Sequence, residues 1–174
     1  MAGEVVVTAK RTSAAVAAYK AAEKMLADGC VRAIGRCNHS SQNLADLIER
    51  TDEVPAVNQV ELHPYFIQQA VREADRQHGT ITQSWSPIGG VNLYHTADGD
   101  GARNVLSHPV VLDLADTYGK TPAQIVLRWH LQHGLSAIPK SVRASRIKEN
   151  VDAFDFFLSP RRGGRDRCPR HQGP

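Results

Sequence analysis

The chain has 174 residues, 41% of them hydrophobic and 22% charged, which suits one globular domain with a buried core and excludes a disordered chain. No apolar run approaches the roughly 20 residues of a membrane span, and MAGEVVVTAK is too short an apolar start for a secretory signal, so we expect a cytoplasmic protein without a membrane partner. The net charge of +3 comes from residues 161–174, which hold five arginines and one aspartate, so no general nucleic-acid surface is implied.

Strand and helix patterns alternate along the chain, since short apolar runs predict buried strands and apolar residues three or four apart predict helices. The first half predicts a helix capped by Thr12 or Ser13 and stopped at Gly29, a strand over 31–35, a helix capped by Ser40 or Ser41, a strand over 56–62, a helix over 68–79 and a strand over 80–85. The second half predicts a long Gly-rich loop from Pro87 to about Leu106, helices over 110–119 and 121–134, a strand over 136–140 and a helix over 145–154.

This order, a helix followed by four strand–helix units, is typical of α/β proteins in which helices connect the strands of a parallel sheet. Two architectures fit the pattern. One is an open doubly wound sheet, and the other is part of an eight-unit barrel, which normally takes about 250 residues. In both architectures ligands bind at the carboxyl ends of the strands.

Polar side chains gather at the ends of all four expected strands. They are Cys37, Asn38, Asn58, Gln59, Glu61, His63, Ser84, Trp85, Ser86, Lys140 and Ser141. The amides could hydrogen-bond a flat carboxamide heterocycle that stacks on Trp85, and the basic helix start with Arg143 and Arg146 could hold a phosphate. Taken singly, each residue has a plainer explanation as a core amide, a core aromatic or a solvated charge. Their coincidence at the same strand ends carries the prediction.

The cysteines and histidines do not form a metal-binding pattern. Cys30, Cys37 and Cys168 include no CxxC pair, which favours reduced thiols over a disulfide framework or a zinc site. His130 and His133 share a helix face, but no carboxylate or cysteine lies at ligand spacing, so we expect a solvated helix end there.

Five segments resemble the carboxyl-terminal half of aldo-keto reductases. They are GRCNHS (35–40), PAVNQVELHPYF (55–66), TQSWSPIGG (82–90), GKTPAQIVLRW (119–129) and IPKSVRASRIKENVDAFDFFLS (138–159). The resemblance is nearest to the 2,5-diketo-gluconate reductase-like branch. It implies a partial TIM barrel of about four C-terminal βα units of a (β/α)8 barrel over residues 13–160. Residues 1–12 would be a non-matching segment and residues 161–174 a basic disordered tail.

The resemblance also implies the cofactor NADPH and the residues that bind it. Asn38 and Gln59 would bind the nicotinamide carboxamide, and Trp85 would stack on the ring. Ser86 and Ile88 would line the pyrophosphate path. The 2′-phosphate and adenosine would be bound by Lys140, Ser141, Val142, Arg143 and Arg146, with Glu149 and Asn150 at the adenine. One departure is that the family usually has Gly-Val-Ser-Asn-Phe at positions 35–39, so one serine hydroxyl is missing and Arg36 adds a charge.

The family's catalytic tyrosine, lysine, aspartate and histidine have no counterparts in this sequence, and neither Tyr65, Tyr94, His63 nor His95 replaces them. We therefore expect an NADPH-dependent oxidoreductase chain that keeps the cofactor half, lacks the catalytic half, and acts on a small-molecule carbonyl substrate only if a catalytic half is supplied. The alternatives are a non-catalytic NADPH-binding or interaction module and a gene remnant without function. Open strand edges at 31–35 and 136–140 predict a homodimer or aggregation.

Overall fold

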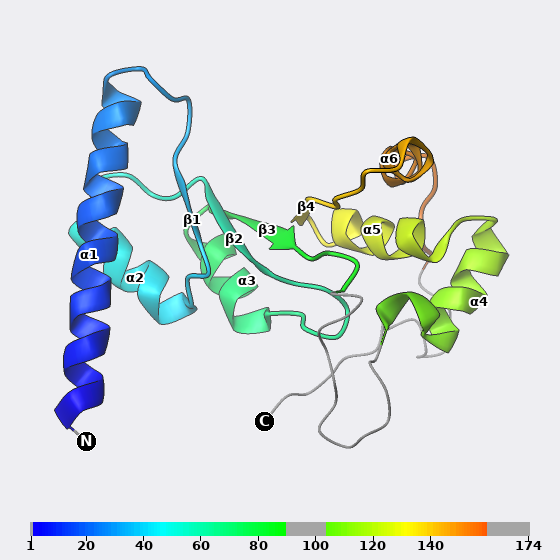
Figure 1. Ribbon diagram of the computed structural model, residues 1–174, viewed down its shortest axis with the longest axis horizontal. Helices are drawn as coiled ribbons and strands as arrows, with labels where there is room; N and C mark the ends of the chain where they lie inside the picture. Colours follow the sequence, from blue (N-terminus) through cyan, green and yellow to red (C-terminus); the bar gives the residue numbers. More distant parts are fainter. Residues whose placement is uncertain (1, 90–103, 160–174) are drawn as a thin grey trace. The chain divides into compact units, whose positions relative to one another are not determined.

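The computed structural model describes residues 2–89 and 104–159 (Figure 1). Most of the expected Gly-rich loop, including Tyr94 and His95, lies outside these residues, as does the basic tail with Cys168. The chain divides into two compact units, Met1–Val60 with Gln69–Thr82 and Glu61–Gln68 with Gln83–Pro174. None of the described helices is long and apolar enough to cross a membrane.

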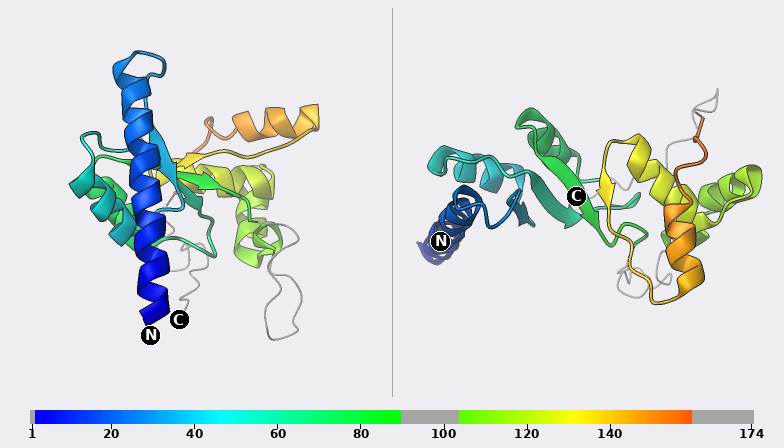
Figure 2. Two further views of the ribbon diagram at one scale, coloured as in Figure 1. Left: turned by 60° about the vertical axis from the view of Figure 1, so that its left-hand side comes forward. Right: turned by 90° about the horizontal axis from the view of Figure 1, so that it is seen from above.

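The first unit contains three helices and the paired strands β1 and β2. Its elements are α1 (Ala2–Ala27), β1 (Gly35–Cys37), α2 (Ser41–Arg50), β2 (Val57–Glu61, of which the last residue belongs to the second unit) and α3 (Gln69–Gln77). The helix α2 contacts both α1 and α3, as Figure 1 and the two views of Figure 2 show. Val16 and Tyr19 of α1 pack with Leu47 of α2, and this apolar cluster forms a small core.

Local sequence signals explain α2 and the end of α1. Of the two predicted caps, Ser40 and Ser41, the helix uses Ser40, whose side chain accepts a hydrogen bond from the Asn43 N–H. Gly29 lies just after the end of α1 and has a positive φ of 72°, a conformation that glycine adopts without a steric penalty. It ends the helix as predicted.

Two expectations for this unit are wrong. The backbone of α1 is helical from Ala2, so Thr12 and Ser13 lie inside the helix and neither caps it. The residues before them include several good helix formers and no proline, which allows the helix to extend. The strand expected over 31–35 begins only at Gly35, because the parallel register pairs Gly35 with Val57 at the start of β2. The strand was expected to be buried, but it is largely exposed.

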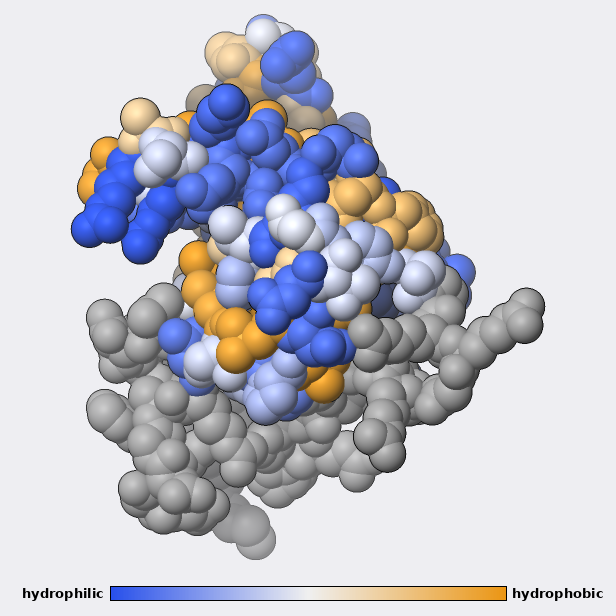
Figure 3. Space-filling view, turned by 90° about the vertical axis from the view of Figure 1, so that its right-hand side faces the viewer, coloured by the Kyte–Doolittle hydropathy of each residue, from blue (hydrophilic) through white to orange (hydrophobic). Residues whose placement is uncertain are grey.

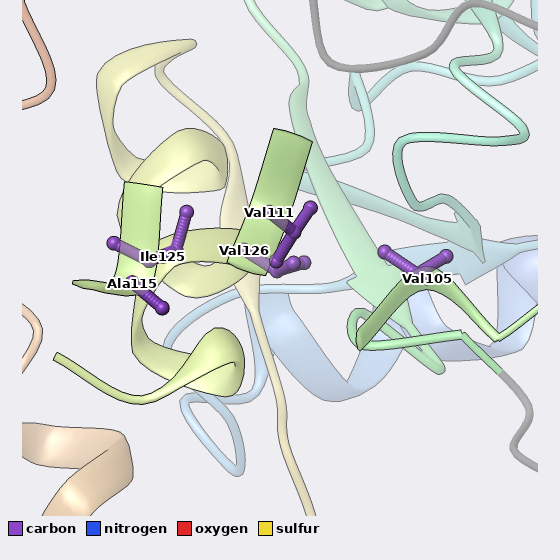
Figure 4. Packing of buried hydrophobic residues seen from close by; sticks show 5 residues of the cluster. All are labelled: Val105, Val111, Ala115, Ile125 and Val126. Atoms are coloured by element: carbon purple, nitrogen blue, oxygen red, sulfur yellow. The ribbon is translucent and has the colours of Figure 1, made fainter. Parts of the chain in front are cut away.

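The second unit is built around α5. It contains the end of β3 (Ile81–Trp85), the short helix η1 (Val105–Ser107), α4 (Pro109–Tyr118), α5 (Pro122–Gln132), β4 (Ser136–Ala137) and α6 (Ala144–Val151). The helix α5 contacts α4, η1, β4 and α6. Its Ile125 and Val126 pack against Val105, Val111 and Ala115 (Figure 4), which together form the core of this unit.

The predicted boundaries of α5 are confirmed. Thr121 caps the helix in a capping box with Gln124, Pro122 occupies the first turn, and Gly134 follows the end with a φ of 69°. The strand expected over 136–140 is shorter, with Ser136 opposite Gln83 and Ala137 opposite Ser84. The Ile138 N–H still donates to the Ser84 carbonyl at 3.2 Å, and Pro139, which has no N–H, cannot extend the ladder.

The strand order in the four-stranded sheet is the chain order, β1-β2-β3-β4. The pairs β1–β2 and β3–β4 are both parallel. Helices follow β1 and β2 and lie between β3 and β4, as in strand–helix–strand units. The predicted α/β class with a parallel sheet is confirmed.

Candidate cofactor-binding site

Asn38 and Gln59 lie next to each other in the first unit. The Asn38 N–H donates to the Gln59 carbonyl at 2.8 Å, directly after the register position at which Cys37 lies opposite Gln59. Asn38 is exposed and Gln59 is half-buried, so a ligand can reach this pair. Asn38 has a positive φ of 54°, which asparagine tolerates better than most residues.

The second amide of β2, Asn58, is fully buried and hydrogen-bonded inside the unit. Its Oδ1 accepts from the His39 N–H at 3.3 Å, and its Nδ2 donates to the His39 carbonyl at 3.0 Å and to Asp75 Oδ1 at 3.1 Å. Thr82 Oγ1 donates to the other Asp75 oxygen at 2.7 Å. A buried amide needs such partners, and Asn58 has them on both ends of its side chain.

Asp75 was not predicted from the sequence as part of any polar cluster. It is fully buried in α3, four residues after the buried Val71, and burial raises the pKa of its carboxyl group, although the hydrogen bonds from Thr82 and Asn58 act in the opposite direction. An aspartate on the apolar face of an amphipathic helix is the signal that could have revealed it, since carboxylates are rarely buried without partners.

The two unusual residues of the 35–39 segment, Arg36 and His39, contact each other. Arg36 Nε donates to His39 Nε2 at 3.4 Å, and the guanidinium lies 5.8 Å from the centre of the Tyr19 ring. His39 Nδ1 lies 3.1 Å from the Cys37 carbonyl, so the neutral tautomer with a proton on Nδ1 satisfies both contacts. Burial lowers the pKa of His39 and raises the pKa of Tyr19 to about 12. The added charge of Arg36 is therefore accommodated by an aromatic face and a neutral imidazole.

Trp85, Ser86 and Ile88 lie in the second unit at the end of β3. Ser86 has a positive φ of 49°, and its carbonyl accepts from the Gly89 N–H at 2.9 Å, which closes a tight turn directly after the strand. Trp85 and Ser86 are half-buried, whereas Ile88 packs against the core cluster around Val105. Trp85 and Ser86 are thus partly accessible to solvent, whereas the nearby Ile88 packs against the core.

The segment between β4 and α6 concentrates positive charge at a helix start. Lys140, Arg143 and Arg146 are exposed, and among residues 2–89 and 104–159 none of these three side chains takes part in an ion pair. Ser141 Oγ accepts from the Arg143 N–H at 3.1 Å, and Arg143 precedes α6 without a side-chain cap hydrogen bond. Unpaired cations beside the free N–H groups of a helix start are suited to a phosphate.

The remaining predicted residues of this segment lie on either side of that helix start. Val142 is 82% exposed, and Glu149 and Asn150 are half-buried near the end of α6. The bond from the Ile138 N–H to the Ser84 carbonyl places the beginning of the segment beside the end of β3. Trp85 and the basic residues therefore come from neighbouring strands of one unit, whereas Asn38 and Gln59 belong to the other unit.

Three polar residues predicted at strand or helix ends are buried and serve the packing instead. His63 is 2% exposed with Nε2 at 3.3 Å from Glu61 Oε1, and Ser84 donates to the Leu62 carbonyl. The prediction of a solvated helix end is wrong for His130, which is fully buried with its two ring nitrogens 2.8 Å from the Val126 carbonyl and 3.2 Å from the Leu62 carbonyl. The cause is that α5 turns this face toward the core. Within the described parts of the chain, no cluster of three His, Cys, Asp or Glu residues could hold a metal ion.

Comparisons with known proteins agree with the resemblance seen in the sequence. The sequence model of the aldo/keto reductase family matches this chain over residues 9–162. Morphine 6-dehydrogenase of Pseudomonas putida is 48% identical over 153 residues, which cover 86% of this chain and 51% of that protein. Methylglyoxal reductase DkgA of Escherichia coli is 43% identical over 143 residues, which cover 82% of this chain and 48% of that protein.

Solved structures give the same result. An aldo/keto reductase from Brucella melitensis superposes with a TM-score of 0.75 at 35% identity, covering 85% of this chain and 52% of the other. A variant of Gox0644 solved in complex with NADPH has a TM-score of 0.72 at 41% identity, covering 83% of this chain and 49% of the other. The chain thus spans about half the length of the relatives that it matches.

Proposed function

Because the chain belongs to the aldo/keto reductase family, we propose that residues 1–174 bind NADPH as the cofactor-binding part of a carbonyl oxidoreductase. The four strands follow one another in chain order in the sheet, as they do in a (β/α)8 barrel, whereas a doubly wound sheet reverses its order. We therefore propose that they form about four units of such a barrel.

The observation that carries the proposal is the unpaired positive charge at the start of α6. Lys140, Arg143 and Arg146 present an ammonium and two guanidinium groups that no carboxylate of the described residues neutralises. A guanidinium offers a planar set of N–H donors that suits a phosphate with several oxygens. NADPH differs from NADH by the 2′-phosphate, so this segment would select NADPH.

The amides of the first unit would serve the other end of the cofactor. Asn38 and Gln59 offer donors and acceptors for a carboxamide. Within the second unit, Trp85 offers a half-buried ring that is suited to stacking on a flat heterocycle. NADPH supplies a hydride when it is bound. A carbonyl reduction also needs a proton donor, and residues 1–174 contain no counterpart of the family's catalytic tyrosine and its three partners, so we propose that these residues bind the cofactor without reducing a carbonyl by themselves.

Titration of the purified chain with NADPH and NADH tests the proposal. We expect tighter binding of NADPH, and we expect Arg146→Ala to weaken NADPH about tenfold or more, because a hydrogen bond to a charged group contributes about 1.5–3 kcal/mol. NADH binding should not change. The matched control is Lys148→Ala, which removes an exposed positive charge from the same helix away from its start. Equal affinity of the wild-type chain for both dinucleotides would contradict the proposal.

A second arm of the experiment measures turnover of methylglyoxal, the substrate in the name of one relative, with NADPH. We expect no rate above background, because a positioned acid–base group supplies about 10²–10⁴-fold in rate. Robust turnover that Gln59→Ala abolishes would show that residues 1–174 supply a proton donor after all.

A further inference from the structure

We infer that Asn58 and Asp75 are positioning residues that fix the conformation of Asn38 and thereby prepare the nicotinamide end of the site. This inference rests on the proposed function. It concerns a hydrogen-bonded chain within the first unit that runs from Thr82 through Asp75 and Asn58 to the backbone of His39.

The argument begins at Asn38, whose backbone has a positive φ of 54°. Non-glycine residues adopt this conformation only where the surroundings hold it. The peptide group before Asn38 is fixed by its N–H, which donates to the Gln59 carbonyl at 2.8 Å. The peptide group after it is fixed by the His39 N–H, which donates to Asn58 Oδ1 at 3.3 Å. Because both flanking peptide groups are held, the direction of the Cα–Cβ bond of Asn38 is set.

Asn58 holds His39 from both sides, since its Nδ2 also donates to the His39 carbonyl at 3.0 Å. The side-chain amide of Asn58 thus pairs with both backbone groups of His39, as the backbone of a neighbouring strand pairs with a strand residue. It acts beyond the end of β1, where the ladder of β1 and β2 has stopped. Without Asn58, the turn that carries Asn38 would lose both of the side-chain bonds that hold the backbone of His39.

Asp75 fixes the orientation of the Asn58 amide. The Asn58 Nδ2 lies between two acceptors, the His39 carbonyl and Asp75 Oδ1 at 3.1 Å, so the nitrogen must face them and Oδ1 must face the His39 N–H. Thr82 Oγ1 donates to the second Asp75 oxygen at 2.7 Å. Asn58 and Asp75 are fully buried and Thr82 is 6% exposed, so the two bonds to Asp75 are shielded from water.

A purely structural network would support the fold of the unit and nothing more. The two possibilities differ in one measurable quantity, the affinity for NADPH relative to that for adenosine 2′,5′-bisphosphate. The bisphosphate carries the adenosine and the 2′-phosphate but no nicotinamide. Loss of the positioning of Asn38 lowers this ratio, whereas general destabilisation lowers both affinities together.

The experiment measures both affinities for the wild-type chain and for Asn58→Ala, Asn38→Ala and the double variant. We expect each single variant to bind NADPH between about threefold and tenfold more weakly, as for the loss of one neutral hydrogen bond, with bisphosphate affinity unchanged within about twofold. The double variant should be no weaker than the single variants, because Asn58 acts through Asn38. Additive losses, or a ratio that Asn58→Ala leaves unchanged, overturn the inference.

Three further variants separate positioning from stability. Thr82→Val removes a buried hydrogen bond to Asp75 but keeps both bonds from Asn58 to His39, so it should lower the melting temperature and leave the ratio unchanged. Asp75→Asn can keep an oxygen toward Asn58 and should keep the ratio, whereas Asp75→Ala should lower it. Equal ratios for the two Asp75 variants contradict the inference.

A measurement that needs no variant guards against failure of Asn58→Ala to fold. Amide hydrogen exchange of the wild-type chain should show the His39 N–H protected like the amides of β2, although His39 lies outside the strands. Fast exchange of this amide overturns the inference whatever the ligands do. A chain that binds NADPH no more tightly than the bisphosphate gains nothing from its nicotinamide end, which overturns the inference as well, whereas a chain that binds neither refutes the proposed function itself.

Discussion

At the scale of single residues, burial of His63 is expected to make the stability of the folded chain depend on pH. The ring is 2% exposed, with Nε2 at 3.3 Å from Glu61 Oε1 and the Tyr65 ring edge-on at 6.5 Å. Desolvation lowers the pKa of His63 to about 4 and raises the pKa of Glu61. The folded chain therefore holds the imidazole neutral at a pH at which the unfolded chain would protonate it.

The sign of the effect on stability follows from linkage. Since the folded pKa lies below the unfolded value, the contribution of His63 is complete above about pH 6.5 and is lost as the pH falls toward 4. Between pH 7 and pH 5 we expect this histidine to reduce the free energy of unfolding by about 2 kcal/mol. Urea unfolding at the two pH values measures the loss, and His63→Gln, which cannot be protonated, should diminish it by that amount.

The control for this experiment is His78→Gln, a change at an exposed histidine of the other unit. It measures how the replacement of an exposed histidine alters the difference between pH 7 and pH 5. If His63→Gln alters that difference no more than His78→Gln does, burial of His63 is not its cause.

At the scale of elements, predictions from the sequence succeeded where the signal was local. Ser40 and Thr121 cap their helices as expected, because a cap depends on residues three positions away. The extents of β1 and β4 were wrong, because a parallel ladder begins where its partner does, as with Gly35 opposite Val57. That register depends on residues far apart in the chain, which periodicity does not reveal.

The capping box of α5 gives a direct test of one such local signal. Thr121 Oγ1 accepts from the Gln124 N–H at 3.3 Å, and Gln124 Oε1 accepts from the Thr121 N–H at 2.9 Å. Thr121→Ala removes the first bond, and we expect it to lower the free energy of unfolding by about 1 kcal/mol. Thermal or urea unfolding followed by circular dichroism measures the change.

Thr117→Ala is the matched control for the capping prediction, since it makes the same substitution in the neighbouring helix α4. Thr117 is exposed and bonds to the Asp113 carbonyl within its own helix, so alanine should have little effect or stabilise slightly. Equal losses for the two variants would show that the capping hydrogen bond is not responsible.

The whole chain shows which parts of a site a sequence can reveal. The residues at strand ends could be proposed as a site because ligands of parallel sheets bind there, and the structure places Asn38 beside Gln59, although their role in binding stays a prediction. The sequence did not distinguish exposed from buried members of the set, so Asn58, His63 and Ser84 were grouped with them although they are buried. The bond from Asn58 to Asp75 joins residues 17 positions apart and could be found only in three dimensions.

Association of the chain is the property that depends on the molecule as a whole. The strands β1 and β4 stand at the two ends of the sheet order, and an unpaired edge is a template for further strands. Hydrophobic residues also interrupt the hydrophilic surface on the face shown in Figure 3. Among the described residues that follow β4, six large apolar side chains are more than two-fifths exposed: Ile138, Val142, Ile147, Val151, Phe154 and Phe157. Apolar surface of this kind promotes association when it is contiguous.

We therefore expect residues 1–174 to aggregate or to form a dimer instead of a stable monomer, with aggregation favoured because no strand is adapted to pair with its own copy. Size exclusion with light scattering at micromolar concentration measures the mass. Ile147→Glu with Val151→Lys, both on exposed positions of α6, should reduce association, whereas Leu112→Glu on the exposed face of α4 should not. A single monodisperse species of 19.1 kDa that unfolds cooperatively would show that neither the edges nor this apolar surface drives assembly.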